Sequence, residues 1–211
     1  MLPIRPDSAE ASALTPTTMV PVPAARRRSL LAAPLVGLSL LLAHPAANAA
    51  LEVGAVAPEF RLPAATAGQV SDFVLSDALK RGPVVLYFFP AAFSYGCNRE
   101  AHAFAEHIEE YKALGATVIG VSNDTIDVIS KFSVQECAGK FSVAADPEKK
   151  VIGAYDSKSF LGGADRTSYV IDTDGKIHFV YSAMLSFAAH IDNTLQALRT
   201  LKGGKAADAG H

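Results

Sequence analysis

The sequence predicts an α/β fold in which a central mixed sheet is flanked by helices, and three observations support it. Short apolar runs recur at Val84–Phe89, Thr117–Val121 and Phe141–Ala145, and each is too short for a helix. Amphipathic segments separate these runs, which is typical of parallel strands joined by helices on both faces of a sheet. Two hairpin patterns flank the alternating block, so the expected order is a β-hairpin, βαβαβα, a second hairpin and a last helix.

The N-terminal β-hairpin is expected from two short segments around a turn. Phe60–Leu62 and Val70–Leu75 bracket the turn at Thr66–Gly68. A short helical turn follows at Ser76–Leu79. After the strand that begins at Val84, apolar residues recur on one helical face until a glycine at position 115 ends the helix. The residues on this face are Cys97, Ala101, Phe104, Ile108 and Tyr111.

The second half of the chain continues the alternation. The expected elements are a strand at Thr117–Val121, a helix from Thr125 to about Cys137 capped by Ser122–Asp124, a strand at Phe141–Ala145, and a helix from Asp146 to about Tyr155 with Pro147 at its first position. A glycine-rich loop at Ser159–Ala164 then leads to a hairpin of Ser168–Asp172 and Lys176–Tyr181. The last helix carries apolar residues from Phe187 to Leu201, and a polar, disordered tail is expected from Gly203.

Residues 1–49 predict an export signal that is removed from the mature protein. Three arginines at 26–28 precede an apolar stretch of about 15 residues, which is shorter than the roughly 20 residues of a membrane span. Ala47-Asn48-Ala49 then matches the small-x-small pattern that signal peptidases cleave. We therefore expect one domain in residues 50–202, a tail in residues 203–211 and no membrane anchor, with an uncleaved anchor as the alternative.

The leader also indicates a compartment. Arg27-Arg28-Ser29-Leu30-Leu31 resembles a twin-arginine signal. Residues 1–25 are unusual before such a signal. Either translation starts at Met19, or the leader is bipartite, as in proteins of the thylakoid lumen. Because Asp7 and Glu10 are unusual in transit peptides, we expect the bacterial periplasm, with the thylakoid lumen as the alternative.

Cys97 lies at the start of a predicted helix, directly after a predicted central strand. The first helical N–H groups have no intrahelical partner and the helix dipole is positive there, so this position stabilises a thiolate, the reactive form of cysteine. Ser94 could cap the helix, or donate to the sulfur or to a substrate oxygen. On these observations alone, Cys97 could equally be a small buried hydrophobic residue at a strand–helix junction.

Pro90, Ser94 and Cys97 have the spacing P-x-x-x-[T/S]-x-x-C. This pattern resembles the active-site motif of the peroxiredoxins (AhpC/TSA family), the cysteine-based peroxidases. The flanking residues from Leu86 to Ala101 resemble the PrxQ (bacterioferritin-comigratory-protein) branch of that family. The resemblance runs from about Val53 to Leu201, and it implies the thioredoxin-like fold and a peroxidatic role for Cys97.

The same resemblance implies roles for residues around Cys97. Arg166 matches the arginine that the family places beside the cysteine, where its planar donors would stabilise charge that develops as the peroxide O–O bond breaks. Without the family match, a solvated loop arginine would be the better interpretation. Glu100 could orient Arg166 by a charge-assisted bond, or could be an ordinary first-turn acid of the helix. Pro90 would shield the thiolate, and Ser94 stands where threonine is commoner in the family.

Cys137 is the only candidate to capture the sulfenic acid that peroxide would form on Cys97. The resemblance implies this resolving role, since some PrxQ members carry the resolving cysteine on the following helix. Others carry it at a position that is His102 here. A disulfide needs Cα atoms within about 7 Å, so we expect both segments to unfold locally. The alternative is a permanent structural Cys97–Cys137 disulfide in an oxidising compartment.

The sequence thus predicts a thiol-dependent peroxidase that reduces hydrogen peroxide and organic hydroperoxides through an intramolecular disulfide, the atypical 2-Cys mechanism. The expected partners are the peroxide and a thioredoxin-like or other thiol reductant, and the protein is expected to be a monomer. The alternatives are a non-catalytic redox sensor and a thiol–disulfide oxidoreductase. The last is disfavoured, because it needs Cys-x-x-Cys and Cys97 is followed by Asn98-Arg99-Glu100.

Composition excludes other classes of function. A net charge of −2 over 211 residues gives no sign of nucleic-acid binding. Two cysteines are too few for a disulfide scaffold, and the histidines show no metal-ligand spacing, so no cofactor and no metal are expected. The histidines of the domain are expected at the surface or half-buried: His102, His107, His178 and His190.

Overall fold

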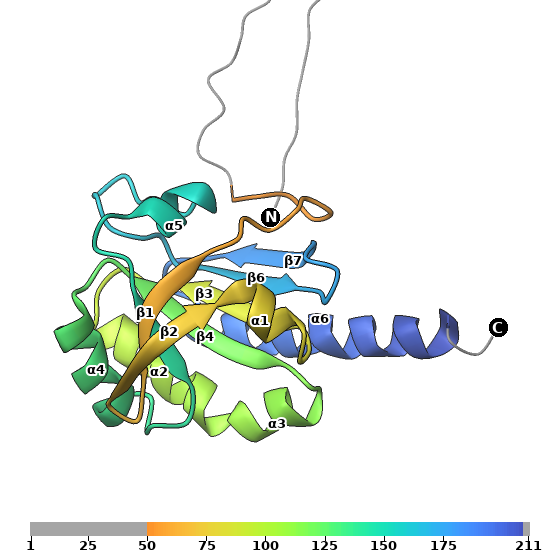
Figure 1. Cartoon of the computed structure of the whole chain (residues 1–211), viewed down its shortest axis with the longest axis horizontal. Coiled ribbons are helices and arrows are strands. Elements are labelled where there is room, and N and C mark those ends of the chain that lie inside the picture. Colours follow the sequence, from red (N-terminus) through yellow and green to blue (C-terminus); the bar gives the residue numbers. More distant parts are fainter. Residues whose placement is uncertain (1–49, 209–211) are drawn as a thin grey trace, which may run out of the picture. The chain divides into compact units, whose positions relative to one another are not determined.

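The computed structural model describes residues 50–208; the predicted export signal in residues 1–49 and the last residues, 209–211, lie outside the described part. A seven-stranded sheet runs in the order β2-β1-β5-β4-β3-β6-β7 (Figure 1). The strands are β1 (Arg61–Thr66), β2 (Gln69–Val74), β3 (Val84–Phe88), β4 (Thr117–Ser122), β5 (Ser142–Ala145), β6 (Thr167–Ile171) and β7 (Ile177–Ser182). β4 pairs in parallel with β3 and β5, and the other neighbours pair antiparallel. The predicted mixed sheet and both predicted hairpins are confirmed.

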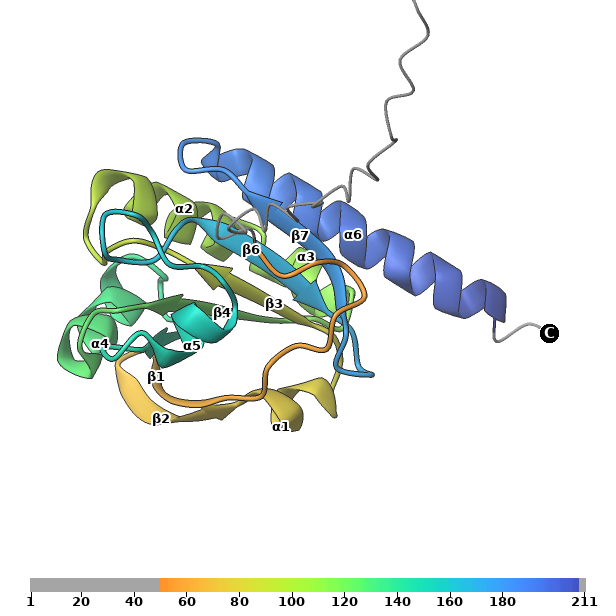
Figure 2. The same ribbon diagram turned by 90° about the horizontal axis from the view of Figure 1, so that it is seen from above.

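Helices cover both faces of this sheet, as predicted (Figure 2). They are α1 (Leu75–Leu79), α2 (Tyr95–Glu106), α3 (Ile108–Ala113), α4 (Ile126–Gln135), α5 (Lys150–Ala154) and α6 (Phe187–Asp208). Val85 and Tyr87 of β3 face a core built with α2, α3, α4 and α6. Leu86 and Phe88 face a second core built with α1 and α5. Both faces of β3 are therefore apolar, which is why its sequence is a continuous hydrophobic run.

The position of β3 is fixed by the strands that pair with it on both sides. Every residue of β3 is buried, and the strand lies between β4 and β6. Tyr87 is paired with Gly120 of β4 and with Ser168 of β6. A Cβ atom at Gly120 would lie 2.5 Å from the Tyr87 ring, so only glycine lets this tyrosine lie over β4. The chain therefore leaves the sheet at one fixed point, directly before the loop that leads to Cys97.

The prediction of one helix from Cys97 to Gly115 is wrong in one respect, because the structure has two helices there, α2 and α3. His107 separates α2 from α3, with non-helical dihedral angles of φ −94° and ψ 7°. Its ring nitrogen Nδ1 lies 2.6 Å from a carboxylate oxygen of Glu110, and its carbonyl accepts from the Glu110 backbone N–H. These local bonds compete with continuation of the helix.

The helix predicted from Asp146 to Tyr155 is also shorter than expected. Pro147 lies in a turn and α5 begins only at Lys150, because Lys149 has a left-handed φ of 56°. The Asp146 carboxylate still accepts from the backbone N–H groups of Lys150 and Ile152, at 3.0 and 2.8 Å. Asp146 thus stabilises the start of α5 from a distance, and the proline is not its first residue.

Two further boundaries differ from the prediction. α4 ends at Gln135, so Cys137 lies in the turn after the helix, and Asp124 does not cap α4. α6 continues to Asp208, so the disordered tail predicted from Gly203 is wrong for residues 203–208. Lys202 donates to the carbonyl of Ala113 in the α3 segment, which holds α6 in place close to the expected boundary.

Candidate active site

Cys97 is the third residue of α2, and its side chain is only 1% exposed. Residues 89–94 connect the end of β3 to this helix. The thiol therefore lies within the first helical turn, where unpaired N–H groups and the positive end of the helix dipole favour a negative charge. The predicted position of Cys97, directly after a central strand and at a helix start, is confirmed.

The loop before Cys97 is anchored from a neighbouring strand end. One carboxylate oxygen of Asp124 accepts from the backbone N–H of Ala92 at 2.7 Å and from the Ser122 hydroxyl at 2.8 Å. Phe93 has a positive φ of 64°, which is rare for a bulky residue, and its ring packs edge-on against Phe132 at 5.4 Å. Such a conformation persists only where surrounding contacts determine it, so the loop holds Cys97 in one place.

Arg166, which directly precedes β6, points at the sulfur. Its Nη2 lies 3.4 Å from Sγ of Cys97, and its Nε donates to the carbonyl of Met184 at 2.9 Å. The guanidinium carbon lies 4.8 Å from the centre of the Phe187 ring. The arginine is 4% exposed, so it is not the solvated loop residue of the alternative interpretation. A fixed positive charge therefore touches the candidate nucleophile.

Glu100 holds Arg166 from the opposite side. Its Oε2 forms an ion pair with Nη1 of Arg166, and the carboxyl group is fully buried. The other oxygen, Oε1, is buried without a hydrogen-bond partner. Burial raises the pKa of Glu100 to about 8, although the neighbouring Arg166 lowers it. Of the two predicted possibilities, the geometry matches the orienting bond to Arg166.

His190 completes this group and is completely buried. Its Nδ1 lies 2.8 Å from the Ser168 hydroxyl and 3.9 Å from Oε1 of Glu100, and its Nε2 lies 2.9 Å from the carbonyl of Ala183. The pKa of His190 is lowered to about 4, mainly by burial and also by the charge of Arg166, although the bond to the Ala183 carbonyl raises it. The prediction that His190 is a surface or half-buried residue is wrong, because α6 packs this position against β6.

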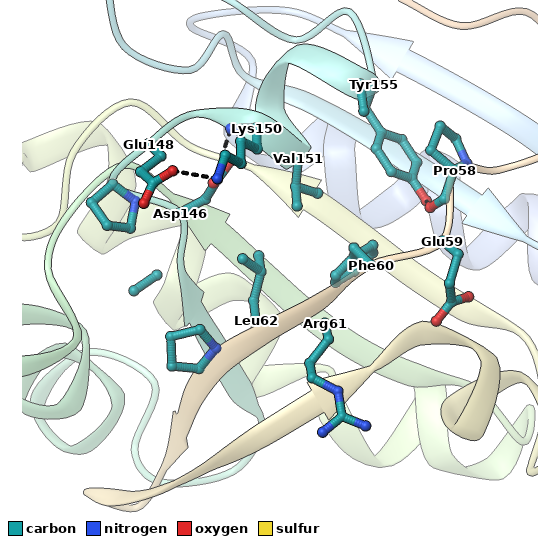
Figure 3. Close-up of a pocket in the computed structure, with 14 residues that line it drawn as sticks. Pro58, Glu59, Phe60, Arg61, Leu62, Asp146, Glu148, Lys150, Val151 and Tyr155 are labelled. Carbon is teal, nitrogen blue, oxygen red and sulfur yellow. Dashed lines mark hydrogen bonds and ion pairs between the residues drawn. The ribbon is translucent and has the colours of Figure 1, made fainter.

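A pocket of about 480 Å³ lies elsewhere, between β1 and α5 (Figure 3). Phe60, Leu62 and Val151 give it an apolar lining, and the hydroxyl of Tyr155 donates to the carbonyl of Pro58 at its edge. None of the predicted site residues lines this pocket. The chemistry is therefore assigned to the buried group around Cys97.

Comparisons with known proteins agree with this geometry. The model of the AhpC/TSA family matches residues 53–180. Peroxiredoxin Q of the Sedum lineare chloroplast is 33% identical over 125 residues, which are 58% of this chain and 67% of that protein. The crystal structure of peroxidoxin BcpB from Mycobacterium tuberculosis is similar with a TM-score of 0.66 and 32% identity, over 71% of this chain and 97% of that one. Thioredoxin peroxidase I of Plasmodium yoelii, at 21% identity and a TM-score of 0.67 over 74% of this chain and 93% of that one, shares the fold.

The matched family and the arrangement around Cys97 point the same way. The chain belongs to the AhpC/TSA family, the peroxiredoxins. The predicted resemblance and the thioredoxin-like fold are thereby confirmed, and so is the enzyme class, a thiol-dependent peroxidase.

The other residues of the peroxiredoxin motif lie where they can shape access to Cys97. Ser94 is the N-cap residue of α2, but its hydroxyl does not cap the helix and donates to the carbonyl of Ala91 at 3.0 Å. Its bond to a substrate oxygen stays a prediction. Pro90 is half-buried at the end of β3, and a Cβ atom at Gly163 would lie 3.3 Å from its carbonyl. The loop at 159–164 therefore lies against Pro90, whose shielding role stays a prediction.

Cys137 is not joined to Cys97 by a disulfide in this structure. Both cysteines are free, Cys137 is fully buried, and burial raises the pKa of its thiol. The turn that carries Cys137 is tied to α2 by two bonds. Glu136 pairs with His102 at 2.8 Å, and Lys140 donates to the carbonyl of Ala105 at 3.0 Å. The resolving role of Cys137 stays a prediction.

Sequence reasoning missed Asp124, Phe187 and His190. One signal could have found His190. It lies three residues after Phe187, on the helical face that continues through Ile191 and Leu195. A histidine on a buried face needs polar partners, which indicates that it meets polar atoms of other elements. Within residues 50–208, no cluster of three or more potential metal ligands occurs. None of the helices in that range is both long and apolar enough to cross a membrane.

Proposed function

We propose that this peroxiredoxin reduces hydrogen peroxide and organic hydroperoxides by the atypical 2-Cys mechanism, with Cys97 as peroxidatic and Cys137 as resolving cysteine. The observation that carries the proposal is the contact of 3.4 Å between Nη2 of Arg166 and Sγ of Cys97 at the start of α2. A guanidinium in this place stabilises a thiolate and presents further donors to a peroxide beside it.

In the first step, the Cys97 thiolate attacks one peroxide oxygen. A sulfur–oxygen bond forms while the O–O bond breaks, and the leaving oxygen takes up a proton and departs as water or an alcohol. Negative charge grows on this oxygen only during bond breaking, so the fixed donors of Arg166 stabilise the transition state more than the ground state. Cys97 becomes a sulfenic acid.

In the second step, the sulfur of Cys137 attacks the Cys97 sulfenic acid. The S–S bond forms, the S–O bond breaks and water leaves. Because Cys137 is buried and tied to α2 through Glu136 and Lys140, this step requires both segments to open. A thioredoxin-like protein or another thiol reductant then returns both cysteines to the thiol state.

Intact-mass measurement after one equivalent of hydrogen peroxide tests this proposal. The reduced protein should lose two hydrogens and regain them with dithiothreitol, and Cys137→Ser should stop at the sulfenic acid. Cys97→Ser should consume no peroxide, because no other residue supplies the attacking sulfur. A wild-type product with oxidised Cys97 and a free Cys137 would reject the resolving role alone. Single oxidation without repeated turnover in the presence of reductant would favour a redox sensor.

We also propose that the enzyme is exported to the bacterial periplasm as a protein that begins at Ala50, with the thylakoid lumen as the alternative. The support is the run of arginines, short apolar stretch and Ala47-Asn48-Ala49 pattern in the leader. N-terminal sequencing of the exported protein should find Ala50, and a sequence that still contains Leu30 would reject cleavage. The mature protein is proposed to be free of membrane and nucleic acid and to sediment as a monomer.

A further inference from the structure

A buried group of polar atoms lies behind the Cys97–Arg166 contact. It contains the carboxyl group of Glu100, the imidazole of His190 and the hydroxyl of Ser168, and all three residues are 0% exposed. They come from three elements, α2, α6 and β6. The group is linked to the sulfur through Arg166, which touches both Glu100 and Cys97. Its protonation state therefore bears on the charge that faces the sulfur.

One acceptor atom of this group, Oε1 of Glu100, has no hydrogen-bond donor. The carbonyl of Ala183, 2.9 Å away, can only accept, so Nε2 of His190 carries the ring hydrogen and Nδ1 presents a lone pair. The Ser168 hydroxyl supplies one hydrogen to Nδ1 at 2.8 Å. Oε1 of Glu100, 3.9 Å from the same nitrogen, receives none. A proton on Oε1 would turn this unpartnered acceptor into a hydroxyl group that lies 3.9 Å from Nδ1.

The charges around the group favour the same proton. Arg166 is the cation in contact with it, and it faces two groups that can be anionic, Cys97 and Glu100. On β3, the buried hydroxyl of Tyr87 stays protonated, because burial raises its pKa well above the ordinary value. From the β7–α6 side the group meets the carbonyls of Ala183 and Met184, which are not titratable, and the ring of Tyr181, whose centre lies 4.8 Å from that of His190. If both anions were ionised, one cation would serve two buried negative charges.

We propose that, while Cys97 is a thiolate, a buried proton is held between Oε1 of Glu100 and Nδ1 of His190. Glu100 is then neutral, so the positive charge of Arg166 stabilises the thiolate alone. The inference rests on the proposed peroxidase function. His190 is then a positioning residue, since it acts on Cys97 through Glu100 and Arg166. The raised pKa of Glu100 and the lowered pKa of His190 place this proton on the carboxyl group.

Oxidation of Cys97 should release this proton. The reaction turns a thiolate, a peroxide and one proton into a sulfenic acid and water or an alcohol. When the negative charge on sulfur disappears, the only anion that Arg166 can pair with in this group is an ionised Glu100. The group then changes from thiolate with neutral carboxyl to neutral sulfur with carboxylate, and its total charge stays the same.

Infrared difference spectroscopy of the reduced protein tests the proton directly. A pH titration should show the carbonyl band of a protonated carboxyl group that disappears as the pH rises through about 8. The band should be absent in Glu100→Gln. Peroxide added at pH 7 should bleach it in the wild type at the rate of Cys97 oxidation. A wild-type protein without this band, or with a band that survives Cys97 oxidation, would overturn the inference.

Variants of His190 separate positioning from a structural role. His190→Gln can keep the donor to Ala183 but loses the Nδ1 acceptor, whereas His190→Asn can place a carbonyl oxygen near the Nδ1 position. His178→Gln, at a half-buried histidine of β7, is the matched control. In His190→Gln we expect the carboxyl band to disappear at a pH about one unit lower than in the wild type, which is equivalent to a tenfold change in proton affinity. In His190→Asn the band should disappear at a pH close to that of the wild type.

The rate of Cys97 oxidation by hydrogen peroxide gives the second readout. In the wild type it should fall by about tenfold as the pH rises through 8, because Glu100 then competes for Arg166. Glu100→Gln should lack this fall, and His190→Gln should show it at lower pH. Equal profiles in the wild type and Glu100→Gln would reject the inference while leaving the peroxidase intact. No oxidation of Cys97 in any protein would instead reject the proposed function.

Discussion

At the scale of single residues, Cys97 depends on partners that are remote in sequence. Arg166 is 66 residues from Glu100 and 69 from Cys97, and only a family motif could connect them before the fold was known. No spacing rule predicts that a loop arginine is buried beside a helix start. His190 was harder still, because its partners Ser168 and Glu100 lie on other elements. A local pattern specifies which face of a helix is buried but not which polar atom it meets.

Arg166→Lys should lower the rate of Cys97 oxidation by about 100- to 1,000-fold, or roughly 3–4 kcal/mol in the activation barrier. Lysine keeps the charge but cannot touch the sulfur, the Glu100 carboxyl group and the Met184 carbonyl together, as the guanidinium does. The measurement is the second-order rate with hydrogen peroxide, at a pH where Cys97 is fully ionised in both proteins. This choice removes the effect of thiolate fraction.

The matched control for that experiment is Arg99→Lys, since Arg99 lies on α2 next to the site but is exposed and donates to Tyr95. It should leave the rate within about twofold of the wild type, because an exposed charge contributes little. If Arg166→Lys also stays within about twofold, Arg166 does not act in the transition state, and its role is limited to stabilising the thiolate.

At the scale of elements, strands were predicted better than helix ends. β3 and β4 are buried on both faces, so their runs of apolar residues determine them almost completely. Helix boundaries depended on side-chain hydrogen bonds that the hydrophobic pattern of the sequence does not predict. The carboxylate of Asp146 reaches N–H groups several residues along, and the ring of His107 meets Glu110 where a continuous helix was expected. The loop to Cys97 likewise depends on Asp124, from the end of β4.

At the scale of the whole molecule, the peroxidase cycle has to open a packed core. Cys97 and Cys137 both belong to the apolar core on the α2–α6 face of the sheet, and both are buried. A structural disulfide that closes about 40 residues would stabilise the domain by roughly 4 kcal/mol in the chain-entropy model. The reduced structure instead contains contacts that must break before a disulfide can form, including the Cys97–Arg166 contact and the Glu136–His102 pair. The two roles of Cys137 therefore predict opposite effects of oxidation on local order.

We expect oxidation to remove hydrogen-exchange protection from the first turn of α2 and from residues 136–140, while amides of β3 and β4 keep theirs. The disulfide pulls Cys97 out of its helix start and Cys137 out of its buried turn, whereas the central strands are held by pairing on both sides. The measurement compares the reduced and peroxide-treated wild type by exchange and mass spectrometry. Cys137→Ser, which cannot form the bond, should keep its protection in residues 136–140 after the same treatment. If oxidation instead leaves both segments protected and slows exchange throughout the domain, the bond is structural and Cys137 does not serve as a resolving cysteine.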